Sequence, residues 1–314
     1  MPAHHLAASP ATTRWGTFSA AYPPVLTIAS GETVTLECVS GSPDTLPPAA
    51  LGHTVPPALH AIHAANPGHA IGGHILTGPV AVEGAEPGDL LQVDIERIEL
   101  GADWGFCGFR PLAGTLPEDF PHRFLSHIAV DRAANTARLP WGTELPLAPF
   151  FGVIGTAPPS AYGAISTKEP REHGGNLDNK ELGAGSTLFL PVWAPGALFS
   201  AGDGHGVQGD GEVCINALEM ALTGTFRLTL HKRSRVRFPR AESPTHFITM
   251  GLDEDLDQAM KQALREMIAL ICERTNLSRD QAYQICSLAV DFHVTQTVNG
   301  NKGVHGMLRR GLLF

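Results

Sequence analysis

The chain of 314 residues is poor in charged side chains and has no long apolar run. Charged residues make up 17% of it, and 31 acidic against 22 basic residues give a formal net charge of −9. This negative balance argues against nucleic acid or an anionic membrane as a partner. No window approaches the roughly 20 consecutive apolar residues that a bilayer-spanning helix needs, so we expect a soluble protein.

Cysteine is also scarce. The five cysteines, at positions 38, 107, 214, 272 and 286, form no C-x-x-C pair. An odd number without such pairs argues against a disulfide framework or a thiolate zinc knuckle and fits a reducing compartment. The N-terminal stretch MPAHHLAASPATTRW lacks the basic and apolar regions of a signal peptide. Together these absences predict a cytoplasmic protein.

Glycine and proline, in contrast, are abundant, with 34 and 25 copies in a chain that is 43% hydrophobic. This mixture predicts many turns between short strands around a large core. Only the last part has helical patterns: an apolar i, i+3/i+4 stripe over 255–273, and a capping box at Ser278 and Gln281 that opens a second helix. We therefore predict an α+β fold with sandwich- or barrel-like sheets and a C-terminal segment containing two helices.

We expect one unit over residues 1–314, with a β-rich body at about 20–245 and a helix-containing subdomain at about 246–314. No linker long enough to separate domains is present. The segment 41–72 is rich in proline, alanine and histidine, with histidines at positions 53, 60, 63 and 69. Their spacing matches no metal-ligand template, so we expect a surface loop.

The segment SAGDGHGVQGDGEV, residues 200–213, concentrates charge and glycine. Core strands tolerate little charge and helices little glycine, so we expect tight turns here. Asp203 and His205 are two residues apart and would face the same way on an extended backbone. Such a pair could ligate zinc, iron or manganese. The alternative is a solvated loop whose carboxylates cap backbone amides.

Two further places carry polar candidates. His173, Asn176 and Asp178 lie on a glycine-broken turn in REHGGNLDNKEL, and His74 immediately precedes a predicted strand. A single histidine such as His74 more often serves a structural role than that of a metal ligand.

Several blocks in order resemble the acetamidase/formamidase family of small-amide hydrolases. The blocks are HILTGPVAVEGAEPGDLL, FFGVIGTAPP, HGGNLDNKEL, LPVWAPGALFSAGDGHGVQGDGEV and ITMGLDEDLDQAM. The resemblance extends from about Gly73 to Lys302 and beyond, whereas the first 70 residues carry little of it. It implies a largely β fold, release of ammonia from simple amides, metal dependence, and assembly into closed homo-oligomers. Gly206 and Asn216 depart from the family pattern, which affects the expected substrate more than the reaction.

If the chain is such an amidase, a divalent ion would activate water and polarise the amide carbonyl. The ligands expected from the resemblance are His74, Asp178, Asp203 and His205. Zinc is the expected metal, with calcium, manganese and iron as alternatives. Glu212 is then the expected general base; alternatively, its carboxylate binds backbone amides of the turn.

Other polar residues would complete the site. We expect Asp210 and His173 to orient the ligands, and Asn176, with the amides of the two glycines before it, to hold the developing oxyanion. Lys302 and His305 lie in a polar turn that suits either a pocket rim or a plain surface loop.

Two alternative functions and the oligomeric state remain open at this point. Cys214 could act as the nucleophile of a thiol amidase, although a buried, inert thiol is more common in an apolar run such as VCINAL. A non-catalytic metal- or sugar-binding β module is the other alternative. The wide apolar stripe on the C-terminal helices predicts a homo-oligomer, with packing of both helices on the β body as the competing interpretation.

Overall fold

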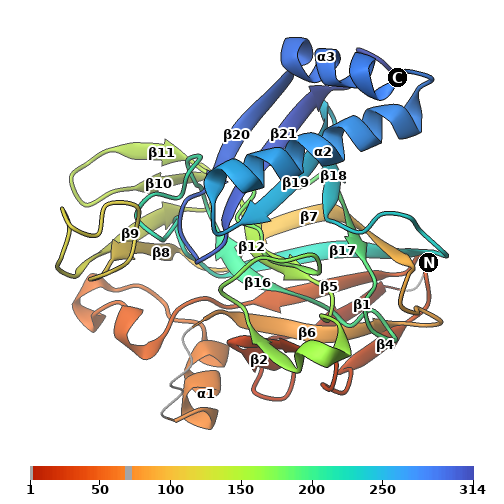
Figure 1. Cartoon of the computed structure of the whole chain (residues 1–314). Helices are drawn as coiled ribbons and strands as arrows, with labels where there is room; N and C mark the ends of the chain where they lie inside the picture. The colour runs from red at the N-terminus through yellow and green to blue at the C-terminus, as the bar shows by residue number, and fades with distance from the viewer. Residues whose placement is uncertain (1–2, 68–72) are drawn as a thin grey trace.

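The computed structural model describes residues 3–67 and 73–314. Within them the chain is rich in short strands, and the α-helices are α1 (Pro57–Ala65), α2 (Leu256–Arg274) and α3 (Arg279–Ala289). Three short 3-10 helices cover Pro43–Thr45, Ala49–Leu51 and Ser160–Tyr162. The predicted α+β fold, a β-rich body with two C-terminal helices, is confirmed (Figure 1).

The largest sheet has nine strands and joins both ends of the chain. In spatial order they are β1 (Ala3–Leu6), β5 (Thr33–Cys38), β17 (Leu222–His231), β7 (Leu90–Leu100), β15 (Thr187–Pro191), β18 (Arg240–Glu242), β19 (His246–Asp253), β21 (Lys302–Arg309) and β20 (Val290–Gln296). The C-terminal strands therefore extend the same sheet that the body begins.

A second sheet has six strands and carries most of the site described below. Its order is β14 (Gly174–Asn176), β12 (Phe150–Gly155), β16 (Phe199–His205), β6 (Ile75–Val82) and β2 (Thr13–Trp15), with β4 (Leu26–Ile28) parallel to β6. A four-stranded sheet consists of β11 (Glu144–Pro146), β10 (Thr136–Arg138), β9 (Phe124–Asp131) and β8 (Trp104–Phe109). Strands β3 (Thr17–Ser19) and β13 (Ala164–Ser166) pair separately.

The main core lies between the two largest sheets. Phe151 on β12 and Phe199 on β16 both contact Phe226 on β17, with ring centroids 5.3 and 5.4 Å apart. All three rings are fully buried. Burial of such rings removes large apolar areas from water, so this contact fixes β12 and β16 against the nine-stranded sheet.

The C-terminal helices lie along β19–β21 at one end of the molecule, and α1 lies at the opposite end (Figure 1). The apolar stripe of α2 faces inward, and its Met267 is fully buried. Ser278 and Gln281 form the predicted capping box of α3. The outer face of α3 exposes Tyr283 and Leu288, which are 59% and 81% accessible.

The expectation of a plain loop over 41–72 was wrong. Proline opens α1 at its first position, and Leu59 and Ile62, three residues apart, are both buried. That spacing packs one face of a short helix inward. His63 contacts the backbone oxygen of Gly41, His60 is exposed, and His69 lies outside the described residues.

In the part of the chain that the structure describes, we find no helix both long and apolar enough to cross a bilayer.

Candidate functional site

Asp203 and His205 lie on β16, a fully buried interior strand of the six-stranded sheet. The expectation of turns was therefore wrong for residues 200–205, whereas the part that follows, 206–213, is a loop with turns. A Cβ atom at Gly202 would lie 2.2 Å from the backbone oxygen of Ile75, and one at Gly204 would lie 2.5 Å from that of Met220. The glycines thus permit backbones to approach closely, while the residues between them carry the polar groups.

The two predicted ligands on β16, Asp203 and His205, meet a second carboxylate, that of Glu219. His205 Nε2 lies 3.2 Å from Asp203 Oδ2 and 3.4 Å from Glu219 Oε2. Asn216 Nδ2 and the amide of Ala217 both donate to the other oxygen of Glu219. All three acidic or imidazole side chains are buried, so the carboxylates face His205 with little water between them.

The tautomer of His205 follows from its hydrogen bond with Gln208. Gln208 Nε2 donates a hydrogen bond of 2.7 Å to the backbone oxygen of Asp178, which turns its Oε1 toward His205 Nδ1 at 2.9 Å. Because a carbonyl oxygen can only accept, Nδ1 carries the proton. His205 Nε2 is left to face the carboxylates, the arrangement by which metal-ligating histidines are commonly oriented.

Asp178 and Glu212 form a second pair of carboxylates near His205. Asn299 Nδ2 donates to Asp178 Oδ2 at 2.6 Å and approaches Glu212 Oε2 at 3.5 Å. Asp178, His205 and Glu212 each place a possible ligand atom within 4.8 Å of those of the other two. Asp178 Oδ1 is buried and makes no hydrogen bond within the described residues. An unpaired buried carboxylate oxygen is costly, so it marks a place for a ligand.

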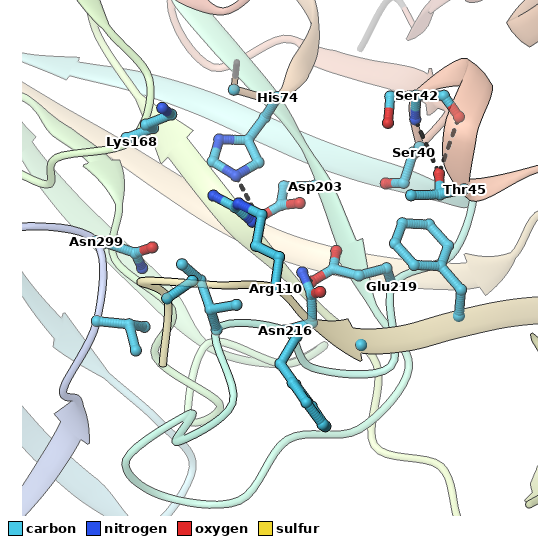
Figure 2. Close-up of a pocket in the computed structure, with 18 of the residues that line it drawn as sticks. Ser40, Ser42, Thr45, His74, Arg110, Lys168, Asp203, Asn216, Glu219 and Asn299 are labelled. Atoms are coloured by element: carbon cyan, nitrogen blue, oxygen red, sulfur yellow. Dashed lines mark hydrogen bonds and ion pairs between the residues drawn. The ribbon is translucent and has the colours of Figure 1, made fainter. Parts of the chain in front are cut away.

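His74 approaches this group from the start of β6. Its Nε2 lies 3.7 Å from Asp203 Oδ2, and its Nδ1 lies 3.2 Å from the hydroxyl of Thr167. Figure 2 shows His74 directed at Asp203, with Asn216 and Glu219 on the neighbouring wall. All four predicted ligands and Glu212 are thus brought into one neighbourhood.

Gly152 on β12 shows where these groups converge. A Cβ atom built there would lie 2.7 Å from both Asp178 Oδ1 and Asp203 Oδ2, and 2.6 Å from His205 Cε1. The missing side chain leaves a small space lined by two carboxylate oxygens and one imidazole. The imidazole atom nearest this space is the carbon Cε1, and His205 Nε2 faces Asp203 Oδ2 and Glu219 Oε2. These carboxylate oxygens and the imidazole nitrogen together form a donor set that suits a divalent ion of the zinc, manganese or iron type.

The pKa values in the cluster reflect buried, unbalanced negative charge. Burial raises the pKa of Asp178 to about 7, against the lowering effect of His205. Burial and the Asp178 carboxylate raise the pKa of Glu212, and burial and Asp203 raise that of Glu219. Burial opposes the charged form of His205, yet Glu219 and Asp203 raise its pKa well above the usual value. A divalent cation would replace these protons, because it stabilises ionised carboxylates.

The cluster lies at the wall of a cavity of about 1050 Å³. His74, Asn176, Asp203, Glu212, Asn216 and Glu219 line it. Lys168, Arg110 and Asn299 surround them in Figure 2. A space of this size admits a small molecule, with polar groups concentrated at one place on its wall.

Of the remaining predicted residues, some line the cavity and others do not. His173 is buried against Phe18, and burial lowers its pKa to about 3. Asn176 lines the cavity, but its Nδ2 donates to the backbone oxygen of Lys168, and its buried Oδ1 has no partner among the described residues. The amide of Gly174 donates to Arg171, so it is not free to hold an oxyanion.

Among the contacts observed, none joins Asp210, Lys302 or His305 to the cluster. Asp210 pairs with Lys180 and His293 instead of the expected ligands. Lys302 is at the cavity rim, where its ammonium donates to the backbone oxygen of Glu254. His305 is buried on β21 and does not line the cavity.

Sequence reasoning missed Glu219, Gln208 and Asn299. Glu219 stands in the run INALEMAL, where one acidic residue among apolar ones was a usable signal, because buried carboxylates are retained only with partners. Gln208 and Asn299 carry no comparable signal, since both stand in polar, glycine-containing segments typical of surface turns.

Cys214 is half-buried beside Cys107, with 3.7 Å between the two sulfur atoms. The hydrogen bond from Cys107 lowers the pKa of Cys214 to about 6. Among the described residues that line the cavity, neither cysteine is present, although Phe106, Ile215 and Asn216 are. Neither thiol is therefore placed at the wall of the space in which a substrate would lie.

Comparison with known proteins shows which family this chain resembles. A sequence profile of the Acetamidase/Formamidase family matches residues 8–162 and 159–305. The acetamidase of Mycolicibacterium smegmatis is 31% identical over 206 residues, which span 47% of the chain but only about half, 51%, of that relative. The formamidase of Methylophilus methylotrophus is 28% identical, covering 72% of the chain and 73% of the relative.

A solved structure gives fuller coverage. The crystal structure of an acetamidase from Bacillus halodurans matches with a TM-score of 0.83 and 32% identity, covering 97% of both chains. The similarity thus extends over both large sheets and the C-terminal helices.

Proposed function

The chain belongs to the acetamidase/formamidase family, and from this premise we propose that it hydrolyses the C–N bond of a small linear amide to a carboxylate and ammonia. A divalent metal, zinc before calcium, manganese or iron, would assist the reaction. The observation that carries the proposal is the convergence of Asp178, Asp203 and His205 on the space beside Gly152, at the wall of an open cavity.

Asp178, Asp203 and His205 would hold the metal, with His74 and Glu219 next to them. The unpaired Asp178 Oδ1 fits this role, as does the buried His205 Nε2, which faces Asp203 and Glu219 while Nδ1 is held by Gln208. A bound divalent ion supplies Lewis acidity, lowering the pKa of water toward ~7 and polarising a carbonyl. The open cavity on one side leaves room for water and substrate, as catalytic sites require.

Glu212 is the proposed general base. It is buried, lines the cavity and approaches Asp178 and His205, and its carboxylate makes no hydrogen bond to a backbone amide among the described contacts. Burial and Asp178 raise its pKa, which makes it a stronger proton acceptor. It would take a proton from the attacking water and return it to the amide nitrogen as ammonia departs.

Asn176 is proposed to position the substrate's amino group. Its Nδ2 is occupied by Lys168, whereas its Oδ1 is buried in the cavity wall without a partner in the described chain. An acceptor suits the N–H groups of a primary amide, so we assign Asn176 to the leaving group in place of the oxyanion. A primary amide would thereby be preferred over an ester, which offers no N–H.

The alternatives receive less support. A thiol mechanism requires the sulfur to reach the substrate, and neither Cys107 nor Cys214 lines the cavity. A binding module with a closed metal site does not explain the open cavity beside the cluster. The relatives named above as acetamidase and formamidase make acetamide and formamide the first substrates to examine.

The test is ammonia release from formamide, acetamide and larger amides, measured with metal content for wild type, Asp203→Ala and His205→Ala. We expect both variants to lose bound metal and activity together while circular dichroism shows a retained fold. Wild-type metal content in both variants would refute the ligand assignment. Failure of the wild type to release ammonia from any amide would refute the function.

A further inference from the structure

A second group of metal-type ligands lies outside the amidase cluster, where the loop 206–212 packs against the hairpin of β20 and β21. Asp210, His293 and His305 each place one ligand atom within 4.8 Å of those of the other two. The loop is fixed there by its backbone, since the amide of Gly211 donates to Thr295 and that of Thr297 donates to Gly211.

The two histidines are arranged by the strand register. His293 on β20 pairs directly with His305 on β21, and their rings are nearly parallel, with centroids 5.1 Å apart and 10° between planes. Asp210 reaches the same place from the loop, with Oδ2 3.2 Å from His293 Nδ1. Paired cross-strand residues are held rigidly, which suits a preformed ligand set.

His305 provides an independent sign of a ligand. Its side chain is 1% exposed, its Nδ1 lies 2.7 Å from the hydroxyl of Thr295, and its Nε2 has no hydrogen-bond partner among the described residues. A buried ring nitrogen without a partner is costly. Burial lowers the pKa of His305 to about 4, so the ring is neutral at pH 7, the form that binds metals.

Lys180 forms an ion pair with only one of the two carboxylate oxygens of Asp210. Its ammonium lies 3.1 Å from Asp210 Oδ1, whereas Oδ2 faces His293. One carboxylate oxygen therefore remains directed at the histidines. One oxygen and two imidazole nitrogens form a donor set typical of zinc, cobalt, nickel or copper and poorly suited to calcium or magnesium.

We propose that Asp210, His293 and His305 form a second binding site, for a divalent transition metal of the zinc class. The ion would join loop 206–212, which carries Gln208 and Glu212, to the β20–β21 hairpin. This site is independent of the amidase proposal, because none of its ligands is among those assigned to the catalytic metal.

Titration of chelator-stripped protein with Zn²⁺, monitored by isothermal titration calorimetry, tests the site. To separate it from the catalytic cluster, the titration compares His205→Ala with the double variant His205→Ala/His293→Ala. We expect one ion per chain in the first and loss of that binding in the second, with affinity falling by more than the ~10–100-fold caused by changes to outer partners. His293 is partly exposed, so its loss should leave the fold intact.

The matched control is His205→Ala/His231→Ala, which removes an exposed histidine that bonds only Gln92 among the contacts observed. This control should retain the ion. The proposal is overturned if His205→Ala alone binds no Zn²⁺, or if the His293 double variant binds it as tightly as the control. If the catalytic site holds no metal, wild type shows a single ion that His293→Ala removes and His205→Ala does not.

Discussion

Four buried carboxylates share a small volume with two histidines: Asp178, Asp203, Glu212 and Glu219 face His74 and His205. Such a group is stable only if protons or a cation balance its charge. Burial raises the pKa of Asp178 to about 7 and also raises that of Glu212, which favours the protonated carboxyl groups when no cation is present. At the residue scale, the account therefore predicts that metal binding releases protons from this cluster.

Glu212→Gln removes the proposed base while keeping the shape of its side chain. We expect the metal to remain and kcat to fall by ~10²–10⁴, because a positioned general base contributes about that factor. Steady-state ammonia release and metal content measure the two effects, with the surface variant Glu83→Gln as control. A kcat close to wild type would show that Glu212 is structural and direct attention to Glu219.

At the scale of elements, the site depends on how closely β12, β16 and their neighbours approach. Gly202 and Gly204 bring backbones together, and Gly152 leaves open the space at which the ligands converge. Strand β16 can hold the buried polar side chains of Asp203 and His205 because each has a partner. Asp203 faces His74 and His205, and His205 also faces Glu219.

Gly152→Ala tests this arrangement by filling the space. The backbone of Gly152 is not in the left-handed region, so β12 should accept alanine, but the new methyl group would lie within 2.7 Å of Asp178 and Asp203. We expect metal loss and an activity decrease of about 10²-fold, the cost of a displacement of ~1 Å in an active site. The control is Gly209→Ala, where an added Cβ meets nothing within 4 Å. Equal activity in both variants would contradict the convergence at Gly152.

The sequence was most informative where periodicity is strong and least where tertiary contacts decide. The stripe of α2 and the Ser278 capping box predicted both C-terminal helices to within a residue or two. The segment around Asp203 was expected to form turns, because single-sequence reasoning treats buried charge as unfavourable and cannot see the partners next to β6 and in distant loops. Asn299 lies 121 residues from Asp178, and no local pattern connects them.

At the scale of the whole molecule, we propose a single unit that assembles into a homo-oligomer. The nine-stranded sheet is continuous from the N-terminal strand β1 to the C-terminal strands, which supports one cooperative unit. The inner face of α2 packs on β19 and β21, whereas α3 leaves Tyr283 and Leu288 exposed. Two exposed apolar side chains on the same helix suit a contact with another copy.

Light scattering should therefore give a mass that is a multiple of 33.3 kDa. Leu288→Glu should dissociate the oligomer without unfolding it, because this side chain is 81% exposed. Met267→Glu should unfold the subunit instead, since it places a charge in the core. A wild-type monomer at micromolar concentration would exclude the assembly.

The central claim is that a metal held by the buried cluster is required for amide hydrolysis. Ammonia release from formamide and acetamide, measured before chelation, after chelation and after return of Zn²⁺, tests it most directly. A parallel sample alkylated at its thiols tests Cys214. We expect activity to disappear on chelation, to return with metal and to survive alkylation. Full activity in the metal-stripped enzyme, or loss on alkylation alone, would contradict it.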